Sequence, residues 1–69
     1  MYRLLVRQIA ESKGISRTRL MRLAEVQYET INGIWHNDKR DVSLTTLLKL
    51  SKALHVDVSE LYKVTNDQE

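Results

Sequence analysis

Cysteine and proline are both absent from this 69-residue sequence. Without cysteine the chain has no disulfide framework, no thiolate metal site and no thiol nucleophile, and a reducing compartment is allowed. Without proline it carries no long extended linker of the proline-rich kind. Apolar runs of the ~20 residues that span a membrane are also missing, and residues 1–14 lack the apolar core and cleavage site of a signal peptide. We therefore expect a cytoplasmic protein that does not enter a membrane.

The residues that are present are typical of a small globular domain. Hydrophobic residues make up 42% of the sequence and charged residues 29%, and the length leaves room for one domain, residues 1–69. A core of this size is marginal unless its helices pack well or the chain oligomerises. So short a chain is not expected to enclose a sizeable pocket, and no cofactor is predicted.

Charge is unevenly distributed along the chain, although the formal net charge is only +2. Residues 1–22 contain six Lys or Arg and one acid, a net of +5, whereas residues 23–69 contain five Lys or Arg and eight acids, a net of −3. The first part could present a basic surface to phosphates. The alternative interpretation is that these charges lie on solvated helix faces.

Residues 17–36 carry the pattern of two short helices joined by a tight turn. Apolar residues recur there at intervals of three and four, which predicts two amphipathic helices that share one core. Ser16 is a good N-cap for the first helix, Arg17–Ala24. In the second helix, about residues 28–36, the polar side chains fall opposite Ile31 and Ile34 and form a hydrogen-bonding face. Such a helix could enter the major groove of DNA.

A further helix is predicted before this motif, over about residues 4–13. Gly14 ends it by supplying the left-handed residue just past the last turn, and Ile15 then folds back onto Ala10. Residues 1–4 are ambiguous, because they could start the helix early or form a short extended arm.

Two helices are predicted after the motif. Ser43 caps a leucine-rich helix whose pattern is broken at His55, and Asp57 with Glu60 forms a capping-box signature that opens a short fifth helix. Residues from about 64 to 69 form a polar tail. The expected fold is an all-α, five-helix domain with the following core: Leu5, Ile9, Leu20, Leu23, Ile31, Ile34, Leu47, Leu50, Leu54 and Leu61.

From Ile15 to Leu54 the chain resembles the lambda-repressor-like helix-turn-helix family, also called the xenobiotic-response-element (XRE) family of bacterial and phage regulators. The resemblance is carried by Ser16, Leu20, Ala24, Val26, Thr30-Ile31, Ile34 and the stretch SLTTLLKLSKAL. It implies a compact DNA-binding domain that acts as a homodimer. In relatives of this length the N-terminal arm is a β-strand, sometimes paired with the other end of the chain or with another subunit.

Two positions depart from the family pattern. Met21 stands where the family usually has a small residue, and Glu25 stands where it usually has glycine at positive φ. Because a non-glycine residue at positive φ is uncommon, we expect either a turn that avoids this conformation at Glu25 or modest strain.

The resemblance also assigns DNA contacts. Base contacts fall to Gln27, Tyr28, Glu29 and Asn32, and phosphate contacts to Arg17, Thr30, Asn37, Lys39 and Arg40. The residue types suit these roles: Asn or Gln can pair with adenine through two hydrogen bonds, Glu can accept from cytosine N4, and Tyr can reach a phosphate or a thymine methyl. Truncating Asn32 should cost the core almost nothing.

The loop between the helix of about residues 28–36 and the leucine-rich helix carries two further expectations. Asn37 stands where relatives have glycine, and asparagine is the next-best residue in the left-handed region. Lys39 and Arg40 have an alternative role as a solvated loop that pairs with Asp38 and Asp41.

Other chemistries lack a supporting pattern. His36 and His55 keep no metal-ligand spacing with Cys or carboxylates, so we predict no metal site. No nucleophile, base and orienting group can be placed together, so we predict that the chain is not an enzyme and has no small-molecule ligand. Trp35 shares the apolar side of its helix with Ile31 and Ile34, which favours a core position over a base-stacking one.

Two functions are therefore compared. The first is a sequence-specific double-stranded DNA-binding transcriptional regulator, a repressor that occludes its operator as a homodimer. The alternative is a protein-interaction module, such as an antitoxin-like or antirepressor partner, whose acidic second half suits a basic protein. A DNA-binding protein should bind in a salt-sensitive manner, whereas an interaction module should co-purify with a polypeptide.

Overall fold

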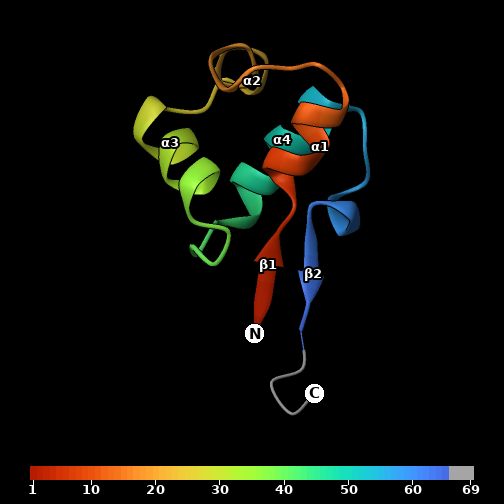
Figure 1. Cartoon of the computed structure of the whole chain (residues 1–69). Helices are drawn as coiled ribbons and strands as arrows, with labels where there is room; N and C mark the ends of the chain where they lie inside the picture. Colours follow the sequence, from red (N-terminus) through yellow and green to blue (C-terminus); the bar gives the residue numbers. More distant parts are fainter. Residues whose placement is uncertain (66–69) are drawn as a thin grey trace.

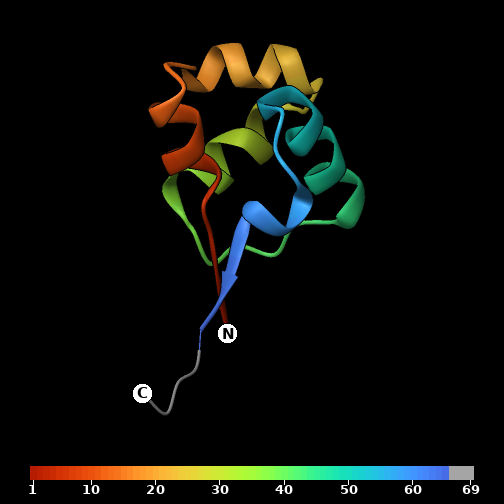
Figure 2. The same ribbon diagram turned by 90° about the vertical axis from the view of Figure 1, so that its right-hand side faces the viewer.

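The structure, a computed structural model, describes residues 1–65. In chain order its elements are β1 (Tyr2–Leu4), α1 (Val6–Ser12), α2 (Arg17–Ala24), α3 (Tyr28–His36), α4 (Leu44–Leu54), a 3₁₀ helix η1 (Val58–Glu60) and β2 (Tyr62–Val64). The helices form one group, from which β1 and β2 extend side by side (Figure 1). Viewed from the side, α2 crosses one end of this group (Figure 2). The predicted helix-turn-helix of residues 17–36 is confirmed.

Side-chain caps begin the helices where the sequence predicted them. The Ser16 hydroxyl accepts a hydrogen bond from the Arg19 amide over 3.1 Å, and the Ser43 hydroxyl accepts from the Thr46 amide over 3.2 Å. Each bond satisfies an amide that the first helical turn leaves free. The bounds of α2 and α3 agree with the predicted ones.

The expectation of five α-helices is wrong, because the last predicted helix is a single 3₁₀ turn. The Glu60 carboxylate does accept from the Asp57 amide over 2.9 Å, as a capping box requires. The chain then leaves the helical path, since the carbonyl of Leu61 accepts from the Leu5 amide over 2.7 Å. The predicted polar tail begins inside β2 at Val64, and its residues 66–69 lie outside the described residues.

The N-terminal arm is extended and pairs with the other end of its own chain. β1 and β2 are antiparallel, with Tyr2 opposite Val64 and Leu4 opposite Tyr62. Helix α1 therefore begins at Val6 and not at residue 4, because residues 2–4 are extended; the Leu4 amide donates to the carbonyl of Asp38 over 2.6 Å. A two-stranded sheet is marginal alone, so its packing against the helices is what holds it.

Polar contacts attach β1 to the loop between α3 and α4. Arg3 forms an ion pair with Asp38 over 3.0 Å, and the Tyr2 hydroxyl donates to Asp41 over 2.7 Å. Within residues 1–65 Lys39 and Arg40 form no ion pair with these two acids, although both side chains are exposed as a solvated loop requires. This hydrogen bond to Asp41, followed by burial and by the charge of Asp41, raises the pKa of Tyr2 above its usual value of 10.0.

Two non-glycine residues occupy the left-handed region, each at a helix end. Glu25 has φ 54° and ψ 45° and ends α2, while His55 has φ 56° and ψ 45° and ends α4. The turn was expected either to avoid positive φ at Glu25 or to carry modest strain there, and the structure has the strained conformation. The expectation for Asn37 is wrong, because its φ of −138° is extended. Asn37 instead uses its side-chain oxygen to accept from the Lys39 amide over 3.1 Å, which shapes the loop.

The core contains residues from every α-helix and from β1. Its buried members are Leu4, Val6, Ala10, Leu20, Ala24, Val26, Ile31, Ile34, Leu50, Leu54 and Leu61. Leu23 was predicted to be buried, but it is 50% exposed, because α2 packs against the core through Leu20 and Ala24. Leu5, Ile9 and Leu47 are half-buried at the edge. Within residues 1–65 no helix is long and apolar enough to cross a membrane.

Candidate nucleic-acid interface

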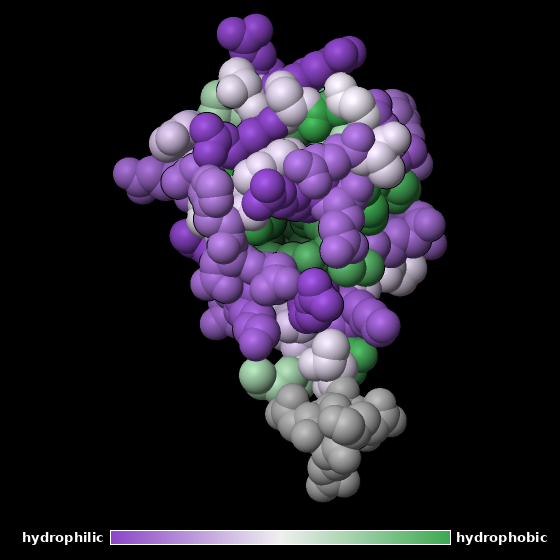
Figure 3. All heavy atoms as spheres, in the orientation of Figure 1, coloured by the Kyte–Doolittle hydropathy of each residue, from purple (hydrophilic) through white to green (hydrophobic). Residues whose placement is uncertain are grey.

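Helix α3 presents a polar face because its apolar side is anchored in the core. Ile31 and Ile34 are both buried, and Trp35 packs against the core while the guanidinium of Arg7 lies 5.7 Å from the centre of its ring. Trp35 is therefore a partly buried core residue, as predicted. On the face of the molecule shown in Figure 3, hydrophilic side chains cover most of the side on which α3 lies.

The four predicted base-contacting residues lie at the start and on the outward side of α3. Gln27 is the N-cap residue, with an extended backbone and an exposed side chain that caps no amide. Tyr28 is 56% exposed and Glu29 is also exposed, so both are free to meet a ligand. Asn32 is half-buried, which the sequence did not predict, because a side chain from α2 covers it.

That side chain is Arg17, the first residue of α2. Its Nη1 donates to Asn32 Oδ1 over 2.7 Å and lies 3.2 Å from His36 Nε2. Its guanidinium carbon also lies 5.7 Å from the centre of the Tyr28 ring, within cation–π range. The structure thus brings a predicted phosphate contact together with two predicted base contacts.

The remaining predicted phosphate contacts lie around the C-terminal end of α3 and the loop after it. Thr30 is half-buried, while Asn37, Lys39 and Arg40 are exposed. The Arg40 side chain lies directly over Gly33, where any Cβ would collide with it. Arg40 is therefore placed at the surface of α3 itself, an arrangement that is possible because residue 33 has no side chain.

Two members of this surface were missed by sequence reasoning. His36 and Gly33 were not assigned any contact from the sequence. The signal for His36 was its spacing, since Tyr28, Asn32 and His36 follow one another at intervals of four and share one stripe of the helix. Nothing in the sequence indicated that Arg40 would fold back over Gly33.

Most of the basic side chains of this surface lack an acidic partner. Within residues 1–65 the ion pairs are Arg3 with Asp38 and Arg7 with Glu11, so none involves Arg17, Lys39 or Arg40. Cations that are not neutralised inside the protein can attract a polyanion. The described part of the chain contains no group of three or more His, Cys, Asp or Glu side chains that could hold a metal.

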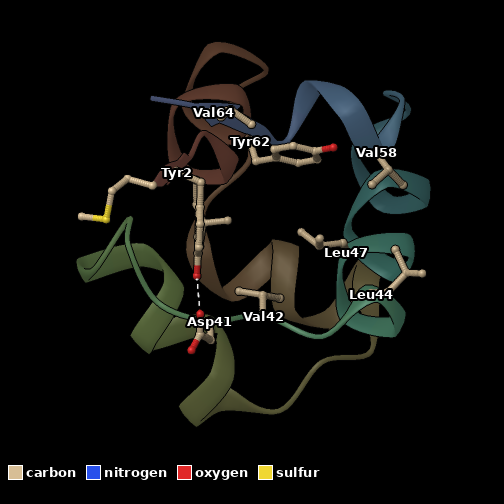
Figure 4. Close-up of a pocket in the computed structure, with 10 residues that line it drawn as sticks. Tyr2, Asp41, Val42, Leu44, Leu47, Val58, Tyr62 and Val64 are labelled. Atoms are coloured by element: carbon tan, nitrogen blue, oxygen red, sulfur yellow. Dashed lines mark hydrogen bonds between the residues drawn. The ribbon is translucent and has the colours of Figure 1, made fainter. Parts of the chain in front are cut away.

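A second feature lies away from this surface. An open, mostly apolar groove of about 610 Å³ is lined by residues of the two strands, α4, η1 and the segment before α4 (Figure 4). The residues around it are Met1, Tyr2, Leu4, Asp41, Val42, Leu44, Leu47, Val58, Tyr62 and Val64. None of the predicted DNA contacts lines the groove. It is an open depression at the surface.

The fold and this surface together define a helix-turn-helix module: a short helix is held across a second helix whose outward face is polar and flanked by Arg17 and Arg40, which form no ion pair within residues 1–65. Residues 6–67 match the model of the Cro/C1-type HTH DNA-binding domain family. The chain therefore belongs to that family, which confirms the resemblance to lambda-repressor-like and XRE-type regulators. It is a DNA-binding transcriptional regulator by family, and this family is not a class of enzymes.

A solved structure supports the same assignment. The restriction-modification controller protein C.AhdI from Aeromonas hydrophila is 31% identical to this chain, and the match covers 80% of this chain and 82% of that one with a TM-score of 0.71. A search of curated proteins gave no significant match.

Proposed function

We propose that the protein is a sequence-specific double-stranded DNA-binding regulator, a repressor that occludes a promoter when α3 enters the major groove of its operator. The observation that carries this proposal is the outward face of α3, where Tyr28, Glu29 and Asn32 present hydrogen-bonding groups on a helix anchored by two buried isoleucines. Gln27 at the helix start completes the set of base contacts.

Phosphate contacts would position the protein on the duplex without recognising sequence. The residues proposed for them are Arg17, Thr30, Asn37, Lys39 and Arg40. They lie on both sides of the α3 face, and the arginines lack an acidic partner in the described residues. The similarity to a protein named as a restriction-modification controller supports a regulatory role.

The repressor would act as a homodimer, because one small module offers a limited interface to DNA and two copies double it. The apolar groove is the surface we propose for the second copy. Two residues that line it are strongly exposed, Leu44 at 65% and Val64 at 72%. Large apolar side chains that are exposed together mark interaction sites. Because no proposed DNA contact lines the groove, a partner there leaves α3 free.

Selection of bound sequences from a random duplex library tests this function. We expect one enriched, two-fold symmetric sequence, bound at least a thousandfold more tightly than random DNA and with an affinity that falls steeply as salt rises. A reporter gene whose promoter overlaps that sequence should then lose expression when the protein is present. Failure to enrich any sequence, together with a stoichiometric polypeptide partner, would favour the protein-interaction module instead.

A further inference from the structure

One guanidinium group connects three residues of the proposed recognition helix. Nη1 of Arg17 donates to Asn32 Oδ1 over 2.7 Å, and the same nitrogen lies 3.2 Å from His36 Nε2. The guanidinium carbon of Arg17 lies 5.7 Å from the centre of the Tyr28 ring. The bond to Asn32 is partly buried, so water competes less for it than for an exposed contact.

The chemistry of arginine fixes which end of the Asn32 side chain faces it. A guanidinium has only donors, so the atom it meets must be the acceptor Oδ1 of the carboxamide, and the NH₂ group must point the other way. The opposite orientation would bring the NH₂ donors against the guanidinium and lose the charge-assisted bond. A free asparagine, by contrast, can turn either end toward a ligand.

We propose that Arg17 is a positioning residue for base recognition, which holds the Asn32 NH₂ group toward the DNA and thereby excludes cytosine at one base position. In the major groove guanine, adenine and thymine each present an acceptor, at N7, O6 or O4, that an outward NH₂ group can meet. Cytosine presents only its N4 donor there, so it would face a second donor. This inference rests on the proposed function, because it requires that α3 enters the major groove.

The same arginine can still contact the backbone. Within residues 1–65 its side-chain bonds use Nη1 alone, so Nε and Nη2 stay available to a phosphate. Loss of Arg17 should therefore have two separable effects. Loss of the charge weakens binding to every duplex, whereas loss of positioning changes the choice at a single base pair.

The experiment compares two duplexes: the selected operator, and the same operator with cytosine at the base that Asn32 contacts. That base is located as the position where Asn32→Ala relaxes the selection. For the unchanged protein the dissociation constant of the cytosine duplex should be roughly tenfold to a hundredfold higher. Arg17→Ala should reduce the ratio of the two dissociation constants, cytosine duplex over operator, to about threefold or less. Arg17→Ala combined with Asn32→Ala should reduce that ratio no further than either change alone.

Arg19→Ala is the matched control for lost charge. Arg19 is exposed on the same helix, and within residues 1–65 its side chain makes no hydrogen bond or ion pair. This variant should weaken binding to both duplexes equally and leave the ratio unchanged.

Asn32→Asp tests the inference without removing Arg17. The aspartate can keep its contact with the guanidinium while it presents an acceptor, not a donor, to the base. The preference should then reverse, so that the cytosine duplex binds more tightly than the original operator.

Two results would overturn the inference while the proposed function stands: an unchanged ratio in Arg17→Ala despite weaker binding to both duplexes, or an Asn32→Asp variant that still rejects cytosine. Either would make Arg17 a phosphate contact only. If the unchanged protein bound no sequence better than random DNA, the proposed function and this inference would both be wrong.

Discussion

Glu25 holds a backbone conformation that is costly for any residue with a Cβ. At φ 54° and ψ 45° it lies in the left-handed region, where a side chain approaches the following carbonyl. The turn between α2 and α3 needs this conformation, because the Val26 amide folds back to the carbonyl of Met21 over 3.2 Å. His55 has the same role at the end of α4.

We predict that Glu25→Gly stabilises the protein by a few tenths to about 1 kcal/mol, since glycine removes the strain but gains more freedom in the unfolded chain. His55→Gly should act in the same direction. Glu25→Ala is the control, because it removes the carboxylate but keeps the Cβ and so should bring no such gain. Urea unfolding midpoints measure all three, and a clear loss of stability in Glu25→Gly would contradict the strained turn.

The Asn32 side chain is not fully exposed to solvent. Its side chain is half-buried and accepts a bond from a charged donor, so its truncation removes more than solvent contact. Hydrogen bonds to charged groups contribute about 1.5–3 kcal/mol in favourable sites, and partial exposure lowers that figure. The stability of Asn32→Ala must therefore be measured before any loss of DNA binding is assigned to a base contact.

At the scale of the elements, the strand β1 is closely tied to the helices. Leu4 is 6% exposed and joins the same core as α1 and α3, while Arg3 next to it points to solvent. The two residues differ because side chains alternate between the faces of a strand.

Leu4→Ala should therefore destabilise the protein by about 2–4 kcal/mol, as the loss of a buried leucine side chain does elsewhere. Arg3→Ala should cost less than about 1 kcal/mol, because it breaks only an exposed ion pair. Equilibrium unfolding measures both. Equal, small effects would mean that the arm is not part of the folded core.

The contact between Tyr2 and Asp41 gives the arm a dependence on pH. The hydrogen bond raises the pKa of Tyr2 above 10.0, so the folded state favours the protonated phenol. This contribution to stability is fully present below pH 10.0 and is lost as the pH rises through the folded-state value. The tyrosinate absorbance of the unchanged protein minus that of Tyr2→Phe isolates this group. Asp41→Asn should bring the pKa of Tyr2 closer to 10.0. A titration midpoint of Tyr2 at or below 10.0 in the unchanged protein would contradict its hydrogen bond to Asp41.

At the scale of the whole molecule, the groove and the α3 surface lie on different elements. Leu44 and Leu48 offer a matched pair to test the groove, since both are exposed leucines of α4, at 65% and 49%, but only Leu44 lines it. A carboxylate at a dimer interface would have to lose its water without gaining a partner.

Leu44→Glu should therefore weaken self-association at least tenfold, whereas Leu48→Glu should leave it unchanged. Sedimentation equilibrium measures this, and circular dichroism confirms that both variants keep their helices. Binding to a single half-site should survive in Leu44→Glu, while binding to the full operator should weaken. An equal effect of the two changes would remove the groove as the dimer surface.

Local patterns in the sequence determined the helices of the DNA-binding motif. The bounds of α2 and α3, the caps at Ser16 and Ser43 and the outward face of α3 all follow from interactions between residues a few positions apart. The family pattern depends on the same positions, so it too could be recognised before the structure was known. These features are predictable because a helix is stabilised along its own length.

The features that the sequence did not determine all join residues far apart in the chain. The packing of helices and strands against one another decides three of them: the strand β1, the exposure of Leu23 and the position of Arg40 over Gly33. The contact between Arg17 and Asn32 spans 15 positions and exists only because the fold brings the start of α2 against α3. Periodicity gives each side chain a direction about its own helix, but only the tertiary structure decides which other side chain it meets.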